Sequence, residues 1–259
     1  MPHTTGRSDA AYAVVFSPLD GAGRAELVQQ RLTDAIVSGI LRDGERLPSE
    51  SDLSRSFGVA LVTAREALEG MRDKGLVITR RGRDGGSFVT FDHDVSTRVF
   101  QRRLREHSRI ELRDMVLHVS AIAGTAAETA TERATDDDIA ALERLAAGAD
   151  LSTGGGARRA VGRFHLEVAA ISQSPRLVHE EVRLQSEAGP LLWMCLQHQE
   201  HRDRAARAWA EVIAALRRFT PGEARTATIA HIDDAFHWLL DERARVDGLA
   251  APATEEHSP

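Results

Sequence analysis

The stretch LPSESDLSRSFGVALVTAREAL, residues 47–68, holds two short helical patterns separated by a tight turn. Ser49 stands three residues before Asp52, which is the spacing of an N-terminal capping box. The short helix that follows is expected to stop at Gly58, and a second helical pattern then continues until Gly75. Two helices joined by a tight, glycine-containing turn form a helix-turn-helix, and we predict that motif here.

The segments on either side extend this motif into a winged helix. Residues 24–41, RAELVQQRLTDAIVSGIL, carry apolar side chains near helical spacing. Residues 76–79 (LVIT) and 87–90 (SFVT) are β-prone, and the glycine-rich basic turn RRGRDGG (80–86) lies between them. A hairpin with arginines at its tip that directly follows a helix-turn-helix is a wing. We therefore predict a winged helix-turn-helix over residues 24–90.

The remainder of the chain is predicted to be helical. Thr135 precedes three aspartates that favour a helix N-terminus, and Pro221 stands where a helix start tolerates proline. The segment 151–156, LSTGGG, is expected to be a flexible loop. The predicted helices span residues 95–105, 109–133, 135–148, 157–171, 175–199, 201–219 and 221–243. The fold class is therefore mainly α, with a winged helix-turn-helix followed by an all-α bundle. The predicted regions are a flexible arm (1–23), the winged domain (24–90), a linker (91–96), the helical domain (97–243) and a disordered tail (244–259).

Composition places the chain among soluble globular proteins. Of its 259 residues, 42% are hydrophobic and 28% are charged, and this length favours two domains. Cys195 is the single cysteine, which excludes an internal disulfide framework and a cysteine-based zinc finger. The sequence has no apolar run near the roughly 18 residues of a membrane span. We therefore expect a cytoplasmic protein without a membrane partner.

The net charge of −6 argues against nucleic-acid binding by the whole chain. Residues 24–90 hold 11 Lys and Arg against 10 Asp and Glu, whereas residues 91–259 hold 21 against 27. Nucleic-acid binding is therefore expected only if the small N-terminal domain concentrates its cations on one face. An enzyme is not expected, because the sequence shows neither a nucleophile–base pattern nor a glycine-rich phosphate motif.

The span from Arg24 to Val89 resembles the winged helix-turn-helix of the GntR family of bacterial transcription regulators. The resemblance is carried by Gly44, Leu47-Pro48-Ser49-Glu50, Leu53, Gly58-Val59, Thr63-x-Arg65-Glu66-Ala67-Leu68, Gly75-Leu76 and Arg81-Gly82. The C-terminal part is similar to the FCD domain of the FadR-type branch, in GTAAETATERATDDDIAALERL (124–145), Phe164-His165 and Ala230-His231-Ile232. The resemblance implies a ligand-responsive repressor that binds a palindromic DNA operator as a homodimer. It also implies that the helical domain binds a small-molecule effector and forms the dimer.

In such a domain the second helix of the motif enters the major groove, and its N-terminal residues reach base edges. The family commonly has Ser or Thr followed by Arg where this chain has Ala60 and Leu61, and often Arg where it has Ser51. Leu61 cannot make the common arginine–guanine contact, so the operator is expected to differ from the family's usual one. The candidate DNA-binding residues are Ser49, Ser51, Leu61, Thr63, Arg65, Arg80, Arg81, Gly82 and Arg83.

These candidates offer different contacts to DNA. Thr63 can bond a phosphate or touch a thymine methyl group, and Arg65 can reach a guanine or a phosphate. The wing arginines can enter the minor groove, where Gly82 lets the backbone pass close to the DNA. Two alternatives stay open: Arg65 pairs with Glu69 one helical turn away, or the wing arginines form a solvated hairpin tip. Glu50 is expected to be structural and to bond the backbone or a neighbouring arginine.

FadR-type regulators often hold a divalent metal with one Asp and three His, and their pocket carries an arginine that grips an acid. By this resemblance the ligand positions fall on Val161, His165, Trp209 and His231, and the arginine position falls on Val119. Only two of these four positions, His165 and His231, still carry a residue that can bind a metal ion. We therefore expect no metal cofactor and a cavity for a less acidic small molecule, held by tryptophan faces and a few polar anchors. The candidate effector-binding residues are His118, Val119, Val161, His165, Gln185, Trp193, Trp209 and His231.

Three interpretations of His165 and His231 stay open. The two histidines bind an organic effector directly, or they are satisfied core histidines, or they hold zinc or nickel together with a third group and sense a carboxylate. His118 is the best candidate for that third group. A constitutive DNA-binding protein without a ligand is a further alternative for the function.

Overall fold

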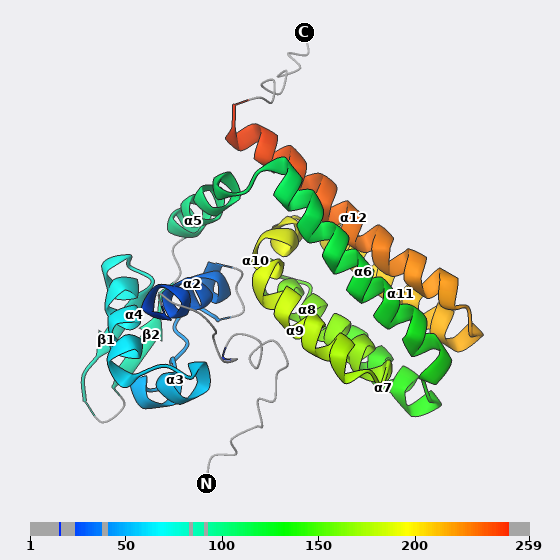
Figure 1. Ribbon diagram of the computed structural model, residues 1–259, viewed down its shortest axis with the longest axis horizontal. Coiled ribbons are helices and arrows are strands. Elements are labelled where there is room, and N and C mark those ends of the chain that lie inside the picture. Colours follow the sequence, from blue (N-terminus) through cyan, green and yellow to red (C-terminus); the bar gives the residue numbers. More distant parts are fainter. Residues whose placement is uncertain (1–15, 17–23, 38–40, 83–84, 91–92, 249–259) are drawn as a thin grey trace.

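The computed structural model describes residue 16 and residues 24–37, 41–82, 85–90 and 93–248. The expected arm, apart from Phe16, and residues 249–259 of the expected tail lie outside the described residues. Figure 1 shows a small N-terminal unit that contains the hairpin and a larger all-helical unit. The elements of the N-terminal unit are α2 (Arg24–Val37), α3 (Glu50–Phe57), α4 (Leu61–Asp73), β1 (Val77–Arg80) and β2 (Gly86–Val89).

Local sequence signals explain how the N-terminal unit folds. Ser49 caps α3 by accepting a hydrogen bond from the backbone N–H of Asp52, and Gly58 ends the helix in the left-handed region at φ 66°. The two strands pair antiparallel, with Ile78 opposite Phe88. Helices and hairpin share one apolar core that includes Leu32, Ile36, Leu53, Phe57, Leu68, Met71 and Val89. The predicted winged helix-turn-helix is thus confirmed.

The helical unit begins with α5 and ends with α12. Its helices are α5 (His93–Glu106), α6 (Arg109–Arg133), α7 (Asp136–Ala147), α8 (Gly154–Ile171), α9 (Pro175–Glu187), α10 (Gly189–Leu192), the 3-10 helix η1 (Trp193–Gln197), α11 (Gln199–Arg218) and α12 (Pro221–Val246). The long helices α6 and α12 lie side by side (Figure 1), and α8 packs against both α6 and α9. The expected cap at Thr135 and the helix start at Pro221 are both present. No described helix combines the length and the apolar character needed to cross a membrane.

The expected single helix over residues 175–199 is wrong. The structure divides this range into α9, α10 and η1. Pro190 lies in the first turn of α10, and a proline inside a continuous helix would lose a hydrogen bond and clash with the preceding turn. The break directs Trp193 into the interior, where it is buried.

The expected loop 151–156 is also shorter than predicted, because α8 already begins at Gly154. Thr153 caps this helix by accepting a hydrogen bond from the Gly156 N–H. A Cβ atom on Gly154 would lie 3.0 Å from Cα of Gln197, so glycine allows the backbone of η1 to approach. At the two ends of the helical unit, α5 starts inside the expected linker and α12 continues three residues beyond position 243, into the expected tail.

An ion pair between Asp34 of α2 and Arg103 of α5 joins the two units. The side chains are only 9% and 15% exposed. Arg103 also donates a hydrogen bond of 3.5 Å to the backbone carbonyl of Glu187, at the end of α9. Burial raises the pKa of Asp34, and the neighbouring Arg103 charge opposes this rise. The pair therefore holds α2 of the N-terminal unit next to the end of α9.

Candidate functional site

The start of α4 presents apolar side chains to solvent. Leu61 is 46% exposed and Val62 is 58% exposed, whereas Thr63 is half-buried. Arg65 pairs with Glu50 at the start of α3, with its Nε and Nη2 atoms each 3.0 Å from the Glu50 carboxylate. The alternative pairing of Arg65 with Glu69 is not observed. The contact with Glu50 instead orients an exposed guanidinium beside the apolar turn of α4, and Glu50 has the structural role expected of it.

Ser49 and Ser51 differ in what they can offer to DNA. The Ser49 hydroxyl is used within the protein, because it accepts from the Asp52 backbone and donates to the Asp52 carboxylate over 2.6 Å. Ser51 is exposed and lies 2.8 Å from the Ser49 hydroxyl. Ser49 therefore serves first as a helix cap, and Ser51 is the freer of the two side chains.

The wing carries its cations on a backbone that specific contacts hold in place. Arg80 lies over the ring of Phe88, with its guanidinium carbon 4.5 Å from the ring centroid. Arg46 donates a 2.6 Å hydrogen bond to the carbonyl of Gly85. Gly82 has a φ of +109°, a conformation that favours glycine. Arg81 is exposed, and the predicted residue Arg83 lies outside the described residues.

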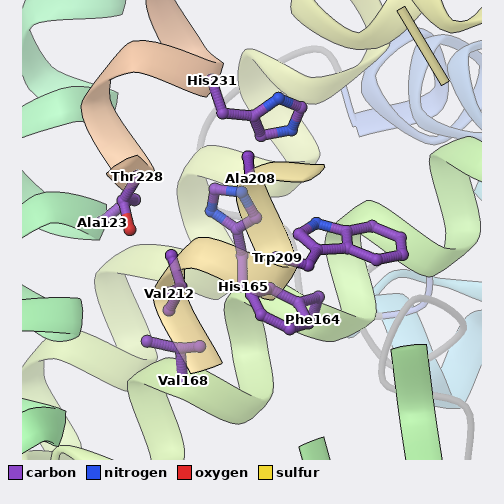
Figure 2. Close-up of a pocket in the computed structure, with 9 residues that line it drawn as sticks. All are labelled: Ala123, Phe164, His165, Val168, Ala208, Trp209, Val212, Thr228 and His231. Carbon is purple, nitrogen blue, oxygen red and sulfur yellow. The ribbon is translucent and has the colours of Figure 1, made fainter. Parts of the chain in front are cut away.

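A small cavity lies inside the helical unit (Figure 2). Its lining comes from α6, α8, α11 and α12 and consists of Ala123, Phe164, His165, Val168, Ala208, Trp209, Val212, Thr228 and His231. Rings of His165, His231 and Trp209 gather on one side of it, and small or aliphatic side chains lie on the other. The cavity measures about 10 Å³, which is close to the room needed by one water molecule. A larger molecule can enter only if side chains move.

Both histidines of the cavity are electrically neutral at physiological pH. Burial, together with the smaller effect of the nearby His231, lowers the pKa of His165 to about 3. Burial likewise lowers the pKa of His231 to about 4, although Asp234 works in the opposite direction. The two ring centroids are 6.0 Å apart. A neutral imidazole carries one hydrogen-bond donor and one acceptor, so each ring can bind either kind of polar group.

A buried carboxyl group that the sequence analysis missed lies next to these histidines. Glu181 of α9 is 1% exposed, and its Oε1 atom lies 3.6 Å from Nδ1 of His165. Burial raises the pKa of Glu181 to about 7, while a hydrogen bond from Gln185 acts against this rise. At physiological pH His165 is therefore neutral and Glu181 is only partly ionised, so the two side chains do not form an ion pair. The sequence contained a signal, because Glu181 shares a helix face with Leu177 and Leu184, which predicts that it points inward.

Trp193 and Gln185 form a second layer behind the cavity. Trp193 stacks on His231 and lies at a tilt to His165, with ring centroids 4.9 and 5.4 Å apart. The Trp193 Nε1–H donates to Gln185 over 3.2 Å, and the Gln185 amide donates to Glu181 over 2.8 Å. The predicted residues Trp193 and Gln185 thus contact the histidines and the carboxyl group, without lining the cavity itself.

The other predicted effector residues lie elsewhere. Val119 and Val161 are buried in the apolar core, and neither lines the cavity. His118 has a 46% exposed side chain and lies 3.9 Å from Glu180, so it does not join the two buried histidines. The resemblance placed Val119 and Val161 near the ligand, and His118 was expected there as a polar alternative. Packing between the helices places all three outside the cavity wall.

The residues present do not fit the four-ligand metal centre of related regulators. Of its four positions only His165 and His231 carry an atom that can bind a metal ion. Val161 has no such atom, and the indole nitrogen of Trp209 donates a hydrogen bond and has no lone pair available for a metal. Among the described residues, no group of three or more His, Cys, Asp and Glu side chains is placed to hold a metal ion. The cavity lining offers hydrogen-bonding atoms on His165, Trp209, Thr228 and His231 and apolar contact from its other side chains.

Comparison with known proteins agrees with both halves of the fold. Residues 24–89 match the model of bacterial regulatory proteins of the gntR family, and residues 114–234 match the model of the FCD domain. RmpR of Mycobacterium gastri, named as an HTH-type transcriptional regulator, is 37% identical over 232 residues, which cover 88% of this chain and 85% of that protein. The HTH-type transcriptional repressor NanR of Edwardsiella tarda is 27% identical over 239 residues, covering 85% and 86%. The structure of McbR/YncC from E. coli superposes with a TM-score of 0.48 at 17% identity, covering 86% and 99%.

Proposed function

Because the chain belongs to the GntR family of bacterial regulatory proteins and carries an FCD domain, we propose that it is a ligand-responsive repressor. Family membership makes it a DNA-binding transcription regulator with an effector domain, not an enzyme. The proposal adds that it binds a palindromic operator as a homodimer, and that a small molecule in the cavity of Figure 2 changes its affinity for DNA. A homodimer doubles the few base contacts of one winged motif at a fixed spacing of half-sites.

Polar atoms without hydrogen-bond partners next to the cavity support the proposal that a small molecule binds there. Nε1 of Trp209, Nε2 of His231 and Oε2 of Glu181 are buried and have no hydrogen-bond partner among the described residues. A buried polar atom without a partner costs about 1–3 kcal/mol, so such atoms are rare in native proteins. Trp209 and His231 line the cavity, so a bound molecule that supplies hydrogen-bond partners for their two ring nitrogens recovers this free energy.

The same atoms indicate the chemistry of the ligand. The Trp209 N–H requires a hydrogen-bond acceptor on the ligand. The neutral imidazole of His231 can donate to an acceptor or accept from a donor, depending on which ring nitrogen carries the proton. The apolar wall formed by Phe164, Val168 and Val212 favours an uncharged body. A carboxylate effector is disfavoured, because Val119 replaces the expected arginine and the cavity lining includes no Arg or Lys. The proposed effector is therefore a neutral, partly apolar molecule with at least one carbonyl or ether oxygen.

A chain of contacts connects the cavity to the N-terminal unit and supports regulation of DNA binding. Trp193 contacts His231 and bonds Gln185, which lies on α9. The end of α9 meets Arg103, and Arg103 pairs with Asp34 of α2. Because the 10 Å³ cavity must enlarge to admit a ligand, movement of the stacked rings reaches α9 and the contact between the two units.

Ligand binding and regulation can be tested together. The full-length protein is screened against neutral metabolites for a rise in melting temperature, and each compound that raises it is then tested in a gel shift with operator DNA. In Trp209→Phe the rise is expected to be lost. It is expected to persist in Trp238→Phe, because Trp238 stacks on Phe100 and does not line the cavity.

Two results would contradict the proposal. Equal stabilisation of both tryptophan variants would show that the compound binds outside the cavity, and a bound ligand without effect on the gel shift would favour a constitutive DNA-binding protein. Sedimentation velocity tests the dimer independently. A monomer at micromolar concentration, with and without DNA, would overturn that part of the proposal.

A further inference from the structure

The N-cap and the first two residues of α4 lack the polar side chains that usually read DNA bases. Ala60, Leu61 and Val62 are three consecutive residues without a polar side-chain atom, and all three are exposed. Large exposed apolar side chains are unfavourable in water, and here two of them are neighbours on one turn. This turn is the part of a recognition helix that reaches base edges in the major groove. The apolar surface therefore lies where a base-reading surface is required.

One chemical group in the major groove matches such a surface. Each A·T pair presents the 5-methyl group of thymine there, and apolar side chains read this methyl by direct contact. Hydrogen-bond acceptors and donors of guanine, cytosine and adenine find no partner on Leu61 or Val62. Arg65 lies one helical turn after Leu61, and the Glu50 carboxylate holds it there at 3.0 Å. A methyl-reading turn and a guanidinium thus lie next to each other on α4.

We propose that Leu61 and Val62 read thymine methyl groups in the major groove, so that each half-site of the operator carries A·T pairs opposite the first turn of α4. The inference rests on the proposed operator binding and specifies how the bases are read. Burial of one methyl group changes an equilibrium constant about fourfold. Loss of one contacted methyl group should weaken binding by about this factor.

The experiment removes individual methyl groups from DNA. The full-length protein first selects duplexes from a random-sequence pool, and fluorescence anisotropy gives the dissociation constant of the selected operator. Each thymine of a half-site is then replaced by deoxyuridine, which lacks the 5-methyl group and keeps every hydrogen-bonding atom. We expect one or two thymines in each half-site to show an approximately fourfold loss for each methyl group, and the remaining thymines to show none.

Matched variants assign the loss to particular side chains. Leu61→Ala and Val62→Ala alter exposed side chains and should leave the fold intact, which circular dichroism verifies. When Leu61→Ala or Val62→Ala removes the side chain that contacts a given thymine methyl group, replacing that thymine with deoxyuridine should no longer weaken binding. Ile110→Ala is the control, because Ile110 is exposed on α6 in the helical unit, and it should keep the full deoxyuridine effect.

The outcomes separate this inference from the function on which it rests. A pool that yields no preferred duplex contradicts operator binding itself. A selected operator in which every deoxyuridine is neutral, or in which the loss persists unchanged in both alanine variants, overturns the reading of methyl groups alone. If the apolar turn instead contacts a second copy of the chain, Leu61→Ala changes the sedimentation of the free protein and leaves the deoxyuridine effect unaltered, which also overturns the inference.

Discussion

The indole ring of Trp193 lies nearly parallel to the imidazole ring of His231, with 4.9 Å between the ring centroids and 17° between the planes. This stack fixes a histidine that the family resemblance places at a metal-ligand position, in surroundings where burial lowers its pKa to about 4. Trp193 is held in turn by its hydrogen bond to Gln185. His231 is therefore a fixed, neutral hydrogen-bonding group at the wall of the cavity.

The two buried indoles should respond differently to the same substitution. Trp193→Phe removes a donor that is bonded to Gln185 and leaves a buried amide oxygen without its partner, which should cost about 1–3 kcal/mol beyond the loss of ring volume. Trp209→Phe removes an N–H that has no partner among the described residues, so it should cost less. Urea unfolding of the two variants measures the difference in free energy. A larger loss in Trp209→Phe would contradict the observed hydrogen bonding.

The stability of the protein should depend on the protonation of Glu181. Burial raises the pKa of this carboxyl group from 4.5 to about 7. Between these values the folded protein holds a proton that the unfolded chain has released, so this group's contribution to stability falls as the pH rises. Glu181→Gln removes that dependence. Relative to the wild type, the variant should gain up to about 3 kcal/mol on going from pH 5 to pH 8.

Thermal unfolding of both proteins at the two pH values checks the effect of Glu181→Gln. The histidines, whose lowered pKa values act in the opposite direction, are present in both proteins and cancel in the difference. The exposed residue Glu211 provides a control, because Glu211→Gln should show no comparable change. A stability difference between Glu181→Gln and the wild type that does not vary with pH would show that Glu181 stays ionised in the folded protein.

The ion pair that joins the two units should be strongly coupled. Asp34→Ala and Arg103→Ala each leave a largely buried charge without its partner, and we expect each to cost about 3–5 kcal/mol. The double variant should lose much less than the sum, because no unpaired charge remains. As a reference, Glu143→Ala breaks the exposed pair with Arg217 and should cost less than about 1 kcal/mol. Additive losses in the double variant would argue against the pair.

Substitution of the arginines on the DNA-binding surface should weaken operator binding. Arg65→Ala and Arg81→Ala should each cost about 1–3 kcal/mol if their side chains contact base edges. Arg55→Ala is a suitable control, because Arg55 lies on α3 with a 78% exposed side chain and pairs with Asp52. Gel-shift midpoints on the selected operator provide the measurement. Unchanged midpoints for both Arg65→Ala and Arg81→Ala would mean that another surface reads the DNA.

Removal of metal ions should not affect the fold. With Val161 and Trp209 at two of the four ligand positions, we expect a chelator such as EDTA to leave the melting temperature unchanged. Loss of a tightly bound structural ion would lower the melting temperature, because binding and folding are linked. Elemental analysis of the purified protein completes the test. Stoichiometric zinc or nickel together with a chelator-induced drop would support the metal-dependent alternative.

Local signals were sufficient to predict the N-terminal unit and most helix boundaries. The cap at Ser49, the left-handed turn at Gly58 and the cap at Thr135 each act within one helical turn, and each occurs where the sequence indicated it. The helix over residues 175–199 was predicted wrongly because helical periodicity continues across Pro190. The break at that residue depends on backbone sterics, which the apolar pattern does not reveal.

The sequence by itself determined the fold class, the family resemblance and the two histidines that line the cavity. Only the tertiary structure decided which groups surround those histidines: it brought Glu181 to His165, stacked Trp193 on His231 and left Val119 and Val161 outside the cavity wall. It likewise paired Arg65 with Glu50 rather than with Glu69. The physical reason is distance along the chain. Caps and turns depend on neighbours within a few residues, whereas the burial and partners of these side chains depend on how separate helices pack.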